Sequence, residues 1–287
     1  MLLGISASRR KWGNCETAVK SVLLAAMRGG SKTAFIRLTD IPLEPCRGCF
    51  RCLAGGGACP TEDGLYDLLC HVRSADSLVL AAPVYFTAPP AKLFSLLDRL
   101  LTVSAFKPEE GRRKLAATVT IMGNRRWRGV AEPYVNLIVS LLGFAIEDSV
   151  PVVAEGPGEV LSDAKTVARL QAIGTAFAEG RKLDVTGERA NVCPVCRSDF
   201  FVIESSELVC PVCGLKGDLA AYAKDGTFSR TGGEPRWGTG WLKAHVEAWM
   251  KPSVERFKAN RRDTLSKLSE FRSRYASEEE RGSVDVH

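Results

Sequence analysis

The chain has 287 residues, of which 45% are hydrophobic and 25% are charged, and its formal net charge is +6. No apolar run approaches the roughly 20 residues that a membrane-spanning helix requires. The N-terminus lacks the length and charge order of a secretion signal, so we expect a cytoplasmic protein that does not enter a membrane. The modest positive charge fits an acidic partner as well as nucleic acid, and it therefore does not predict nucleic-acid binding.

Short apolar strands alternate with amphipathic helical patterns through the first two-thirds of the chain. The expected strands cover residues 2–5, 33–38, 77–82, 115–122 and 144–153. The helical patterns that follow them cover residues 19–27, 61–72, 93–100, 135–142 and 163–179. Five strands alternating with five helices predict an α/β fold with a doubly wound, five-stranded parallel sheet. Ligands of such sheets bind at the carboxyl ends of the strands, beside the point where the strand order reverses.

The first strand runs into a polar loop that opens a helix. This loop reads Ser6-Ala-Ser8-Arg-Arg10-Lys-Trp-Gly13-Asn14-Cys15-Glu16. Hydroxyls, basic side chains and the backbone N–H groups of a helix start suit a phosphate group. The sequence has neither a G-x-x-x-x-G-K-S/T nor a G-x-G-x-x-G string, which excludes the nucleoside triphosphate loop and the dinucleotide fingerprint. A polar connection with an ordinary helix cap would account for the same residues.

The segment after the second strand carries four cysteines within fourteen residues: Cys46, Cys49, Cys52 and Cys59. The first three have the spacing of the bacterial ferredoxin run C-x2-C-x2-C-x3-C-P, and Pro60 follows the fourth. The last gap is longer and contains three glycines, at residues 55–57, that let the chain turn back. This spacing favours a 4Fe-4S cluster over a zinc site, which normally uses two separated C-x2-C pairs. Zinc and plain structural thiols are the alternatives.

Two further loops follow the third and fourth strands, at the same expected edge as the cysteine loop and the polar loop. They read Pro83-Val-Tyr85-Phe86 and Gly123-Asn124-Arg125-Arg126-Trp127-Arg128. The polar loop and the Pro-Val-Tyr-Phe segment resemble the phosphate loop and the ring loop of NAD(P)H-dependent FMN reductases. With the cysteine run between them, residues 1–182 resemble the iron-sulfur flavoproteins of the flavodoxin-like superfamily.

This resemblance implies a flavodoxin-like domain that binds FMN and assigns roles to its loops. The FMN phosphate would be held by Ser6, Ser8, Arg10, Gly13, Asn14 and the backbone of Cys15. The flavin ring would be bordered by Pro83, Tyr85 and Phe86, with Gly123 and Asn124 on its other side. Packing of Tyr85 and Phe86 beneath their own loop is the alternative.

The sequence departs from the family's usual pattern at three places. Cys15 stands where the family usually has Thr, and Arg9 stands where it usually has Pro. Both changes leave the backbone donors of the loop intact, so FMN binding is still expected. The third loop is more basic and bulkier than usual at residues 125–128, which leaves the substrate or partner preference open.

A second cysteine group follows residue 184. Cys193-Pro-Val-Cys196 and Cys210-Pro-Val-Cys213 are separated by thirteen residues, which is the spacing of a zinc ribbon. Residues 200–203 and 207–209 read as two short strands, and we expect a small module over residues 190–222. Zinc is the favoured metal, and a single redox-active iron, as in rubredoxins, is the alternative.

Residues 236–287 form an expected C-terminal helical extension. Residues 224–241 read as a loop, residues 241–250 as a helix, and a longer helix opens at Pro252. That helix carries an apolar stripe: Val254, Phe257, Leu265, Leu268, Phe271 and Tyr275. The stripe is either a packing face or a contact in a homo-oligomer, which we expect for this protein. The polar residues 277–287 are expected to fray.

Three functions fit these patterns. The leading hypothesis is an FMN-dependent oxidoreductase that passes electrons between the cluster and FMN, with NAD(P)H or a reduced ferredoxin as donor and an unknown acceptor. The second is an NAD(P)H-dependent FMN or quinone reductase whose cysteine loop binds zinc or nothing. The third is a redox-sensing regulatory protein that reads DNA or another protein. The three histidines are scattered, so we assign no catalytic acid or base.

Overall fold

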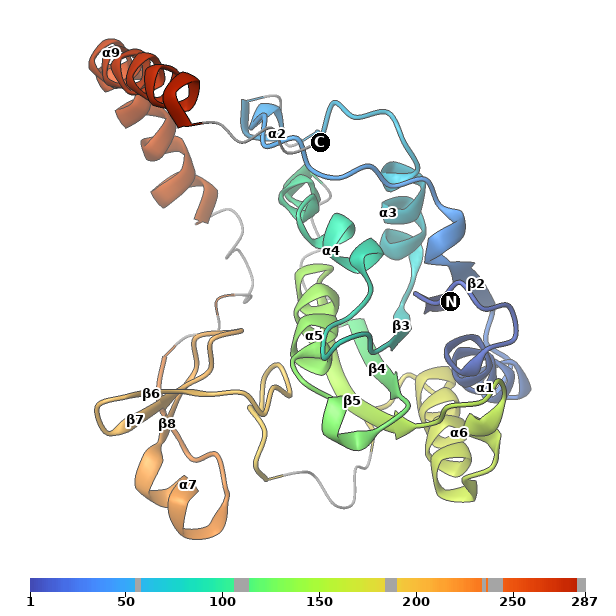
Figure 1. Cartoon of the computed structure of the whole chain (residues 1–287). Coiled ribbons are helices and arrows are strands. Elements are labelled where there is room, and N and C mark those ends of the chain that lie inside the picture. The colour runs from blue at the N-terminus through green and yellow to red at the C-terminus, as the bar shows by residue number, and fades with distance from the viewer. Residues whose placement is uncertain (55–57, 106–113, 184–189, 234–235, 237–244, 283–287) are drawn as a thin grey trace. The chain divides into compact units, whose positions relative to one another are not determined.

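A five-stranded parallel sheet forms the centre of the molecule (Figure 1). The computed structural model describes residues 1–54, 58–105, 114–183, 190–233, 236 and 245–282. The strands of the sheet are β1 (Leu2–Ser6), β2 (Thr33–Arg37), β3 (Ser77–Pro83), β4 (Lys114–Met122) and β5 (Phe144–Val153). They are arranged in the order β2-β1-β3-β4-β5, with every neighbouring pair parallel. The predicted doubly wound sheet is confirmed, and its strand order reverses between β1 and β3.

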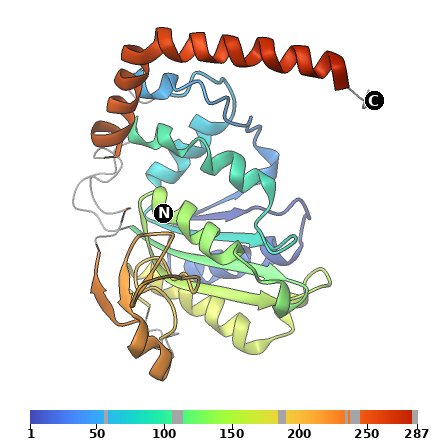
Figure 2. The ribbon, with the colours of Figure 1, turned by 60° about the vertical axis from the view of Figure 1, so that its left-hand side comes forward.

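Helices cover both faces of the sheet (Figure 2). They are α1 (Asn14–Arg28), α3 (Leu65–Ser74), α4 (Ala91–Leu97), α5 (Ala131–Leu141) and α6 (Ala164–Ala178). The helices α1 and α6 pack together on one face, and α3, α4 and α5 cover the other. Shorter segments are α2 (Arg51–Ala54), η1 (Leu38–Asp40), η2 (Leu100–Ala105), η3 (Arg125–Trp127) and η4 (Glu159–Leu161).

The three central strands are buried almost throughout, which explains their uninterrupted apolar sequences. On one face, Val79 and Val119 of the sheet pack against α1 and α6. A Cβ added at Gly174 would lie 2.1 Å from the carbonyl oxygen of Val22, so glycine permits the close approach of these two helices. This packing fixes α1, whose N-terminus follows the end of β1.

The boundaries of α4 and α5 differ from the predicted ones. The helix α5 begins at Ala131, ahead of the predicted residue 135, because Pro133 lies in the first turn, where its missing N–H costs nothing. The predicted helix 93–100 is α4 only to Leu97, and a 3-10 segment, η2, follows it.

The second cysteine group lies in the turns next to a four-stranded antiparallel sheet, which has two more strands than predicted. Its strands are β6 (Val202–Glu204), β7 (Glu207–Val209), β8 (Lys216–Asp218) and β9 (Arg230–Gly232), with α7 (Leu219–Asp225) between the last two. The predicted loop from residue 224 is therefore wrong at β9, and β8 and α7 were not predicted. Three-residue strands carry too little alternation to be recognised, and Gly217 contributes no side chain to the pattern.

The C-terminal part, Gly240–His287, forms a compact unit distinct from the unit Met1–Thr239. Its π-helical segment η5 (Val246–Met250) precedes α9 (Lys251–Gly282), which places Pro252 in the first turn of α9 as predicted. The predicted fraying from residue 277 is wrong as far as Gly282, because the Glu-rich sequence there favours a helix. Predictions for residues 237–244 and 283–287 lie outside the described residues. In the described chain, no helix is long and apolar enough to cross a membrane.

Candidate functional site

The N-terminus of α1 follows the loop after β1. Ser6 and Ser8 are buried, and each accepts a backbone N–H two residues further on, at 3.4 and 3.2 Å. Gly13 is the N-cap residue of α1, and among the described residues no side chain caps this helix. The first N–H groups of α1 are therefore available to an anion, as the positive end of a helix dipole requires.

The shape of this loop depends on Gly13. Its N–H donates to the Arg10 carbonyl at 3.1 Å, and a Cβ added at Gly13 would lie 2.7 Å from the Cβ of Arg10. Trp12, directly before it, has a φ of 56°, which is in the left-handed region that larger side chains rarely adopt. A tight turn with strained backbone at a helix start is typical of a ligand-binding loop.

Two of the predicted phosphate-loop residues can contribute only through their backbone. The Asn14 side chain donates to the carbonyls of Ala154 and Gly156 at 3.3 and 2.8 Å and accepts the N–H of Val160 at 3.2 Å. The Cys15 thiol is 3% exposed in the core, and burial raises its pKa to about 12. The side chains of both residues thus fasten α1 to the rest of the domain.

The loop after β3 presents its aromatic residues to solvent. Tyr85 is 52% exposed and Phe86 is 87% exposed, so the alternative in which they pack beneath the loop is wrong. Phe86 and Thr87 have φ values of 45° and 67°, and Tyr85 and Ala88 exchange backbone hydrogen bonds at 2.9 and 3.0 Å. The loop is therefore a strained, ordered turn with its rings available to a ligand.

The loop after β4 is fastened to the loop after β3. The N–H of Val130 donates to the Thr87 carbonyl at 2.8 Å, and a Cβ added at Gly129 would lie 2.1 Å from the Cβ of Thr87. The exposed rings of Phe86 and Trp127 lie edge to face with centroids 6.3 Å apart. From the sequence, Trp127 was noted only as a bulky residue. Because its ring contacts that of Phe86, Trp127 is also a candidate for contact with the flavin ring.

The predicted residues Gly123 and Asn124 stand at the start of the loop after β4 and are exposed. The Asn124 side chain accepts the N–H of Arg126 at 2.9 Å and so caps η3. Pro83 ends β3 and is half-buried. All the predicted ring residues therefore belong to the carboxyl ends of β3 and β4, next to the strand that leads into α1.

The first cysteine loop begins after η1, at the carboxyl end of β2. Its later part lies away from this edge of the sheet. Its helix α2, which contains Cys52, contacts η2, the segment after α4 (Figure 1). The aromatic loop after β3 precedes α4, so the two loops lie at opposite ends of that helix. The expectation of one shared rim is wrong, because a connection from residue 41 to residue 64 is long enough to cross the helix layer.

The four cysteines of this loop have unequal surroundings. Cys46 and Cys49 are exposed, and Cys52 and Cys59 are half-buried. The N–H of Gly48 donates to the Cys46 Sγ at 3.4 Å. Burial and the neighbouring charges of Cys59, Cys46 and Cys49 raise the pKa of Cys52. The described residues do not bring three of these sulfurs within 4.8 Å of one another. The glycines at residues 55–57 lie outside the described residues.

Cys59 is the best-anchored cysteine of the loop. The Tyr66 hydroxyl hydrogen-bonds both its N–H and its carbonyl, and Nη2 of Arg99 donates to its Sγ at 3.4 Å. Burial acts to raise the pKa of Cys59, but hydrogen bonds from Thr61 and Arg99 outweigh it and hold the pKa below that of an ordinary thiol. This sulfur is therefore prepared for the thiolate form in which cysteine binds metals.

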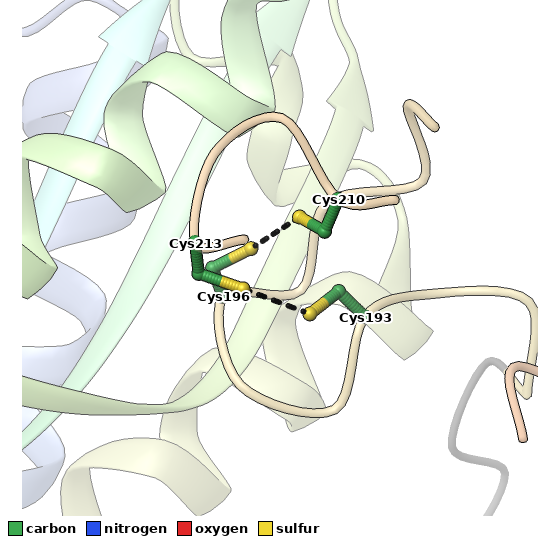
Figure 3. A group of neighbouring side chains, drawn as sticks. All are labelled: Cys193, Cys196, Cys210 and Cys213. Atoms are coloured by element: carbon green, nitrogen blue, oxygen red, sulfur yellow. Dashed lines mark hydrogen bonds between the residues drawn. The ribbon is translucent and has the colours of Figure 1, made fainter. Parts of the chain in front are cut away.

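The second cysteine group converges on one point (Figure 3). The Sγ atoms of Cys193, Cys196, Cys210 and Cys213 all lie within 4.8 Å of one another, and all four side chains are fully buried. A tetrahedral ion with metal–sulfur bonds of about 2.3 Å would space its sulfurs by about 3.8 Å, which fits this set. Hydrogen bonds with the sulfurs of Cys193, Cys210 and Cys213 raise the pKa of Cys196. Hydrogen bonds with Cys193 and Cys196 instead lower the pKa of Cys210.

Both halves of this four-cysteine group have the same turn. The N–H of Arg197 donates to the Cys193 carbonyl at 2.9 Å, and the N–H of Gly214 donates to the Cys210 carbonyl at 2.8 Å. Arg197 and Gly214 have φ values of 58° and 81°. The surrounding core contains three other buried residues, Leu208, Leu215 and Phe228. Cysteines thus form four of the seven buried residues of this small core.

Polar contacts that the sequence did not reveal fasten this module to the parallel sheet. The Asn136 side chain donates to the Cys196 carbonyl at 2.9 Å and also hydrogen-bonds Thr118 and Ser149. Arg128, from the loop after β4, pairs with Asp199 of the module at 2.6 Å. The four-cysteine module is therefore linked to the loop that carries Trp127.

Comparison with known proteins agrees with this geometry. A family model described as NADPH-dependent FMN reductase matches residues 1–156. The chain belongs to the NADPH-dependent FMN reductase family. Family membership covers the sheet and the loops after β1, β3 and β4, and it makes the chain part of a family of FMN-dependent oxidoreductases.

Several proteins with similar sequences are named iron-sulfur flavoproteins. An iron-sulfur flavoprotein of Methanocaldococcus jannaschii is 40% identical over 98 residues, which are 34% of this chain and 50% of the relative. One of Methanosarcina thermophila is 31% identical over 43% of this chain and 64% of the relative. One of Archaeoglobus fulgidus is 30% identical over 50% of this chain and 70% of the relative. The chain thus spans between about half and about two-thirds of the first two relatives.

A solved structure shares the fold over the whole chain. The structure of a flavone reductase is 18% identical, with a TM-score of 0.65, and the match covers 100% of this chain and 99% of that one. At this identity the likeness shows the fold alone. It includes the four-cysteine module and the C-terminal helical unit as well as the parallel sheet.

Proposed function

We propose that this FMN reductase family member is a redox flavoprotein that passes electrons between a 4Fe-4S cluster, held by residues 46–59, and FMN at the loops after β1, β3 and β4. The observation that carries the proposal is the Cys59 sulfur, which accepts hydrogen bonds from Arg99 and Thr61 inside a four-cysteine loop. Sulfur ligands held by N–H donors are typical of iron-sulfur proteins. The names of the relatives support the same conclusion.

The residues present fit FMN. The uncapped N-terminus of α1 and the Arg10 side chain would bind the phosphate, and the buried Ser6 and Ser8 shape the loop. Tyr85, Phe86 and Trp127 would border the ring, together with Pro83, Gly123 and Asn124. When bound, FMN supplies the ability to accept two electrons together and release them singly. The protein binds and orients it and needs no acid or base of its own.

The residues of the first cysteine loop fit a cluster. Cys46, Cys49, Cys52 and Cys59 supply four thiolates, and Gly48, Thr61 and Arg99 supply N–H or O–H donors to two of the sulfurs. When bound, a 4Fe-4S cluster carries one electron at a time. The chain's part is to hold the sulfurs and to set their electrostatic surroundings.

Zinc is our assignment for Cys193, Cys196, Cys210 and Cys213, in a structural role. The support is the compact, fully buried set of four sulfurs and the small core around it. A single iron would fit the same four sulfurs, so metal content decides between the two.

The donor, the location and the assembly are part of the same proposal. The family description favours a nicotinamide donor, NAD(P)H, and a reduced ferredoxin is the alternative. Ten cysteines, eight of them in two metal-binding groups, fit the reducing cytoplasm. We propose a homo-oligomer, because the cysteine loop and the aromatic loop lie at opposite ends of α4, and a second copy could bring a cluster to a flavin.

The test is the content of iron, labile sulfide, zinc and FMN per chain in protein purified without oxygen. The proposal predicts four irons, four sulfides, one zinc and one FMN, by the stoichiometry of the two metal centres. FMN with zinc and no sulfide would contradict it and favour the alternative, an NAD(P)H-dependent FMN or quinone reductase without a cluster. About five irons and no zinc would make the second centre a redox site.

A further inference from the structure

Arg99 is a buried cation between α4 and η2. It is 3% exposed, and its guanidinium contacts the first cysteine loop. Nη1 donates to the Glu44 carbonyl at 3.1 Å and pairs with Asp63. Nη2 donates to the Cys59 Sγ at 3.4 Å and to the Thr61 carbonyl at 3.5 Å. A buried guanidinium is costly unless its charge and donors are satisfied. Here Nη1 and Nη2 are both satisfied, which restricts the position of the guanidinium, while Nε has no partner among the described residues.

The contacts of Arg99 and Asp63 close the loop at its two ends. Asp63 accepts the N–H of Glu44 at 2.8 Å through one oxygen and the N–H of Leu65 at 3.1 Å through the other. The chain that enters the loop and the chain that leaves it therefore meet at one ion pair. This closure uses protein groups alone.

Arg99 distinguishes Cys59 from the other cysteines of the loop. Cys46 and Cys49 are exposed, where water screens any charge near their sulfurs. The Cys59 sulfur instead accepts a charge-assisted hydrogen bond from a group that is almost fully buried. Such a bond is stronger than one between neutral groups, and a low local dielectric strengthens it further.

A donor at a ligand sulfur affects the two oxidation states of a cluster differently. One added electron increases the negative charge on the cluster and its thiolates. A cation and a hydrogen-bond donor at one thiolate therefore stabilise the reduced form more than the oxidised form. Asp63 offsets part of the charge of Arg99 but leaves the hydrogen bond to sulfur in place.

We propose that Arg99 is a positioning residue of the cluster, which holds the Cys59 sulfur in place and raises the reduction potential of the bound 4Fe-4S centre. This inference rests on the proposed function, since it requires a cluster at residues 46–59. It assigns to α4 and η2 a part in tuning the electron carrier.

The test is a potentiometric titration of the cluster in the full-length protein with FMN bound. The variants are Arg99→Lys, which keeps a partner for Asp63, and the double variant Arg99→Met with Asp63→Asn, which leaves no unpaired buried charge. The control is Arg51→Met, which removes an exposed arginine next to Cys52. Thermal unfolding and iron, sulfide and FMN contents are measured on every sample.

We expect the double variant to lower the ratio of reduced to oxidised cluster about tenfold at a fixed potential, which is about 59 mV for a one-electron couple. Arg99→Lys shifts it in the same direction, because one ammonium group cannot serve Asp63 and Cys59 together. Arg51→Met changes the ratio far less. Loss of iron from folded Arg99→Lys, with FMN and thermal midpoint unchanged, would equally support a role in holding Cys59.

Full cluster content with an unchanged potential in both Arg99 variants would overturn the proposal. An equal shift in Arg51→Met would overturn it too, because net charge alone would then explain the effect. Absence of iron and sulfide from the wild-type protein would contradict the proposed function itself. The wild-type sample alone gives this result, so it is distinct from the results for the variants.

Discussion

Single residues fix the loop that would receive the FMN phosphate. Gly13 lets the chain turn tightly into α1, since a Cβ there would lie 2.7 Å from the Cβ of Arg10. Asn14 and Cys15 use their side chains to fasten the start of α1 inside the domain. The groups that would bind the phosphate are therefore mainly backbone N–H groups, whose direction depends on the exact turn.

Gly13→Ala should weaken FMN binding. The added methyl group must displace Arg10 or the turn, and loss of one hydrogen bond to a charged phosphate costs about 1.5–3 kcal/mol, or roughly tenfold to a hundredfold in affinity. Quenching of FMN fluorescence measures the dissociation constant. Gly232→Ala is the matched control, because nothing lies within 4 Å of a Cβ there. Equal affinities of the two variants would contradict the role of Gly13.

Glu16 connects the start of α1 to the end of β2. Its side chain is 2% exposed and pairs with Arg37 and Lys20, each at 2.6 Å. Burial acts to raise the pKa of Glu16, but the hydrogen bonds from Arg37 and Lys20 outweigh it and lower the pKa. A lowered pKa in the folded state means that the ionised pair stabilises the fold.

Glu16→Gln should lower the free energy of unfolding at pH 7 by about 1–3 kcal/mol. The contribution of Glu16 is complete above its unfolded pKa of about 4.3 and is lost as the pH falls through the lower folded pKa, so the difference between wild type and variant shrinks in acid. Urea denaturation at several pH values measures it. Glu247→Gln removes an exposed pair with Lys251 and should cost less than 1 kcal/mol. A difference for Glu16 that does not depend on pH would contradict this account.

The sequence predicted residue types better than it predicted residue partners. The serines and glycine of the loop after β1 and the two cysteine groups could be singled out from their spacing in the sequence, because such spacing is a local property of the chain. The partners of Asn14 lie about 140 residues away, and Asp63 lies 36 residues from Arg99. No local pattern marks such contacts. A single arginine after an amphipathic helix reads as a solvated residue, which is why Arg99 was not recognised.

The loops after β3 and β4 are joined into one structural element at the carboxyl edge of the sheet. Thr87 accepts the N–H of Val130, and the ring of Phe86 meets that of Trp127. Because both rings are exposed, they contribute little to the core and are available to a planar ligand.

Trp127→Ala should therefore weaken FMN binding with little loss of stability. One aromatic contact is worth about 0.5–1.5 kcal/mol, which is roughly twofold to tenfold in affinity. Phe200→Ala, at a ring that is 51% exposed in the four-cysteine module, is the control and should leave FMN affinity unchanged. FMN titration and thermal unfolding of both variants measure the two effects. An unchanged FMN affinity in Trp127→Ala would remove Trp127 from the ring contacts.

We propose that the four-cysteine module depends on a bound metal more than on apolar packing. Cysteines make up four of its seven buried core residues. Cys196→Ser should therefore release the metal and unfold residues 190–232, while the parallel sheet stays folded because its core is separate. Hydrogen exchange measures protection of the two parts, and Cys70→Ser, at an exposed cysteine, is the control. Full protection of the module without metal would contradict a structural role.

Elements with long apolar patterns were predicted well, and short ones were not. The strand β5 was predicted at residues 144–153 and is found there. The strands β8 and β9 have three residues each, and they form through pairing, β8 with β7 and β9 with β8, rather than through an intrinsic sequence pattern. The position of α2 also depends on tertiary contacts with η2, which the sequence of the cysteine loop does not encode locally.

The whole molecule combines a proposed FMN site with two different groups of cysteines. The strand order places the loops after β1, β3 and β4 side by side, and α4 separates the aromatic loop from the first cysteine loop. The second cysteine group contacts the loop after β4 through Arg128 and Asp199. A redox carrier at the first site and a structural metal at the second would give each site a distinct task.

Electron exchange between cluster and flavin is tested most directly by anaerobic reduction with NADPH, followed by visible absorbance, with and without FMN. A hydride donor delivers two electrons together, so it can reduce a one-electron cluster only through the flavin. We predict that NADPH bleaches the cluster absorbance only when FMN is bound, and that dithionite bleaches it in both samples. Bleaching of the flavin alone, with the cluster left oxidised but reducible by dithionite, would contradict the account.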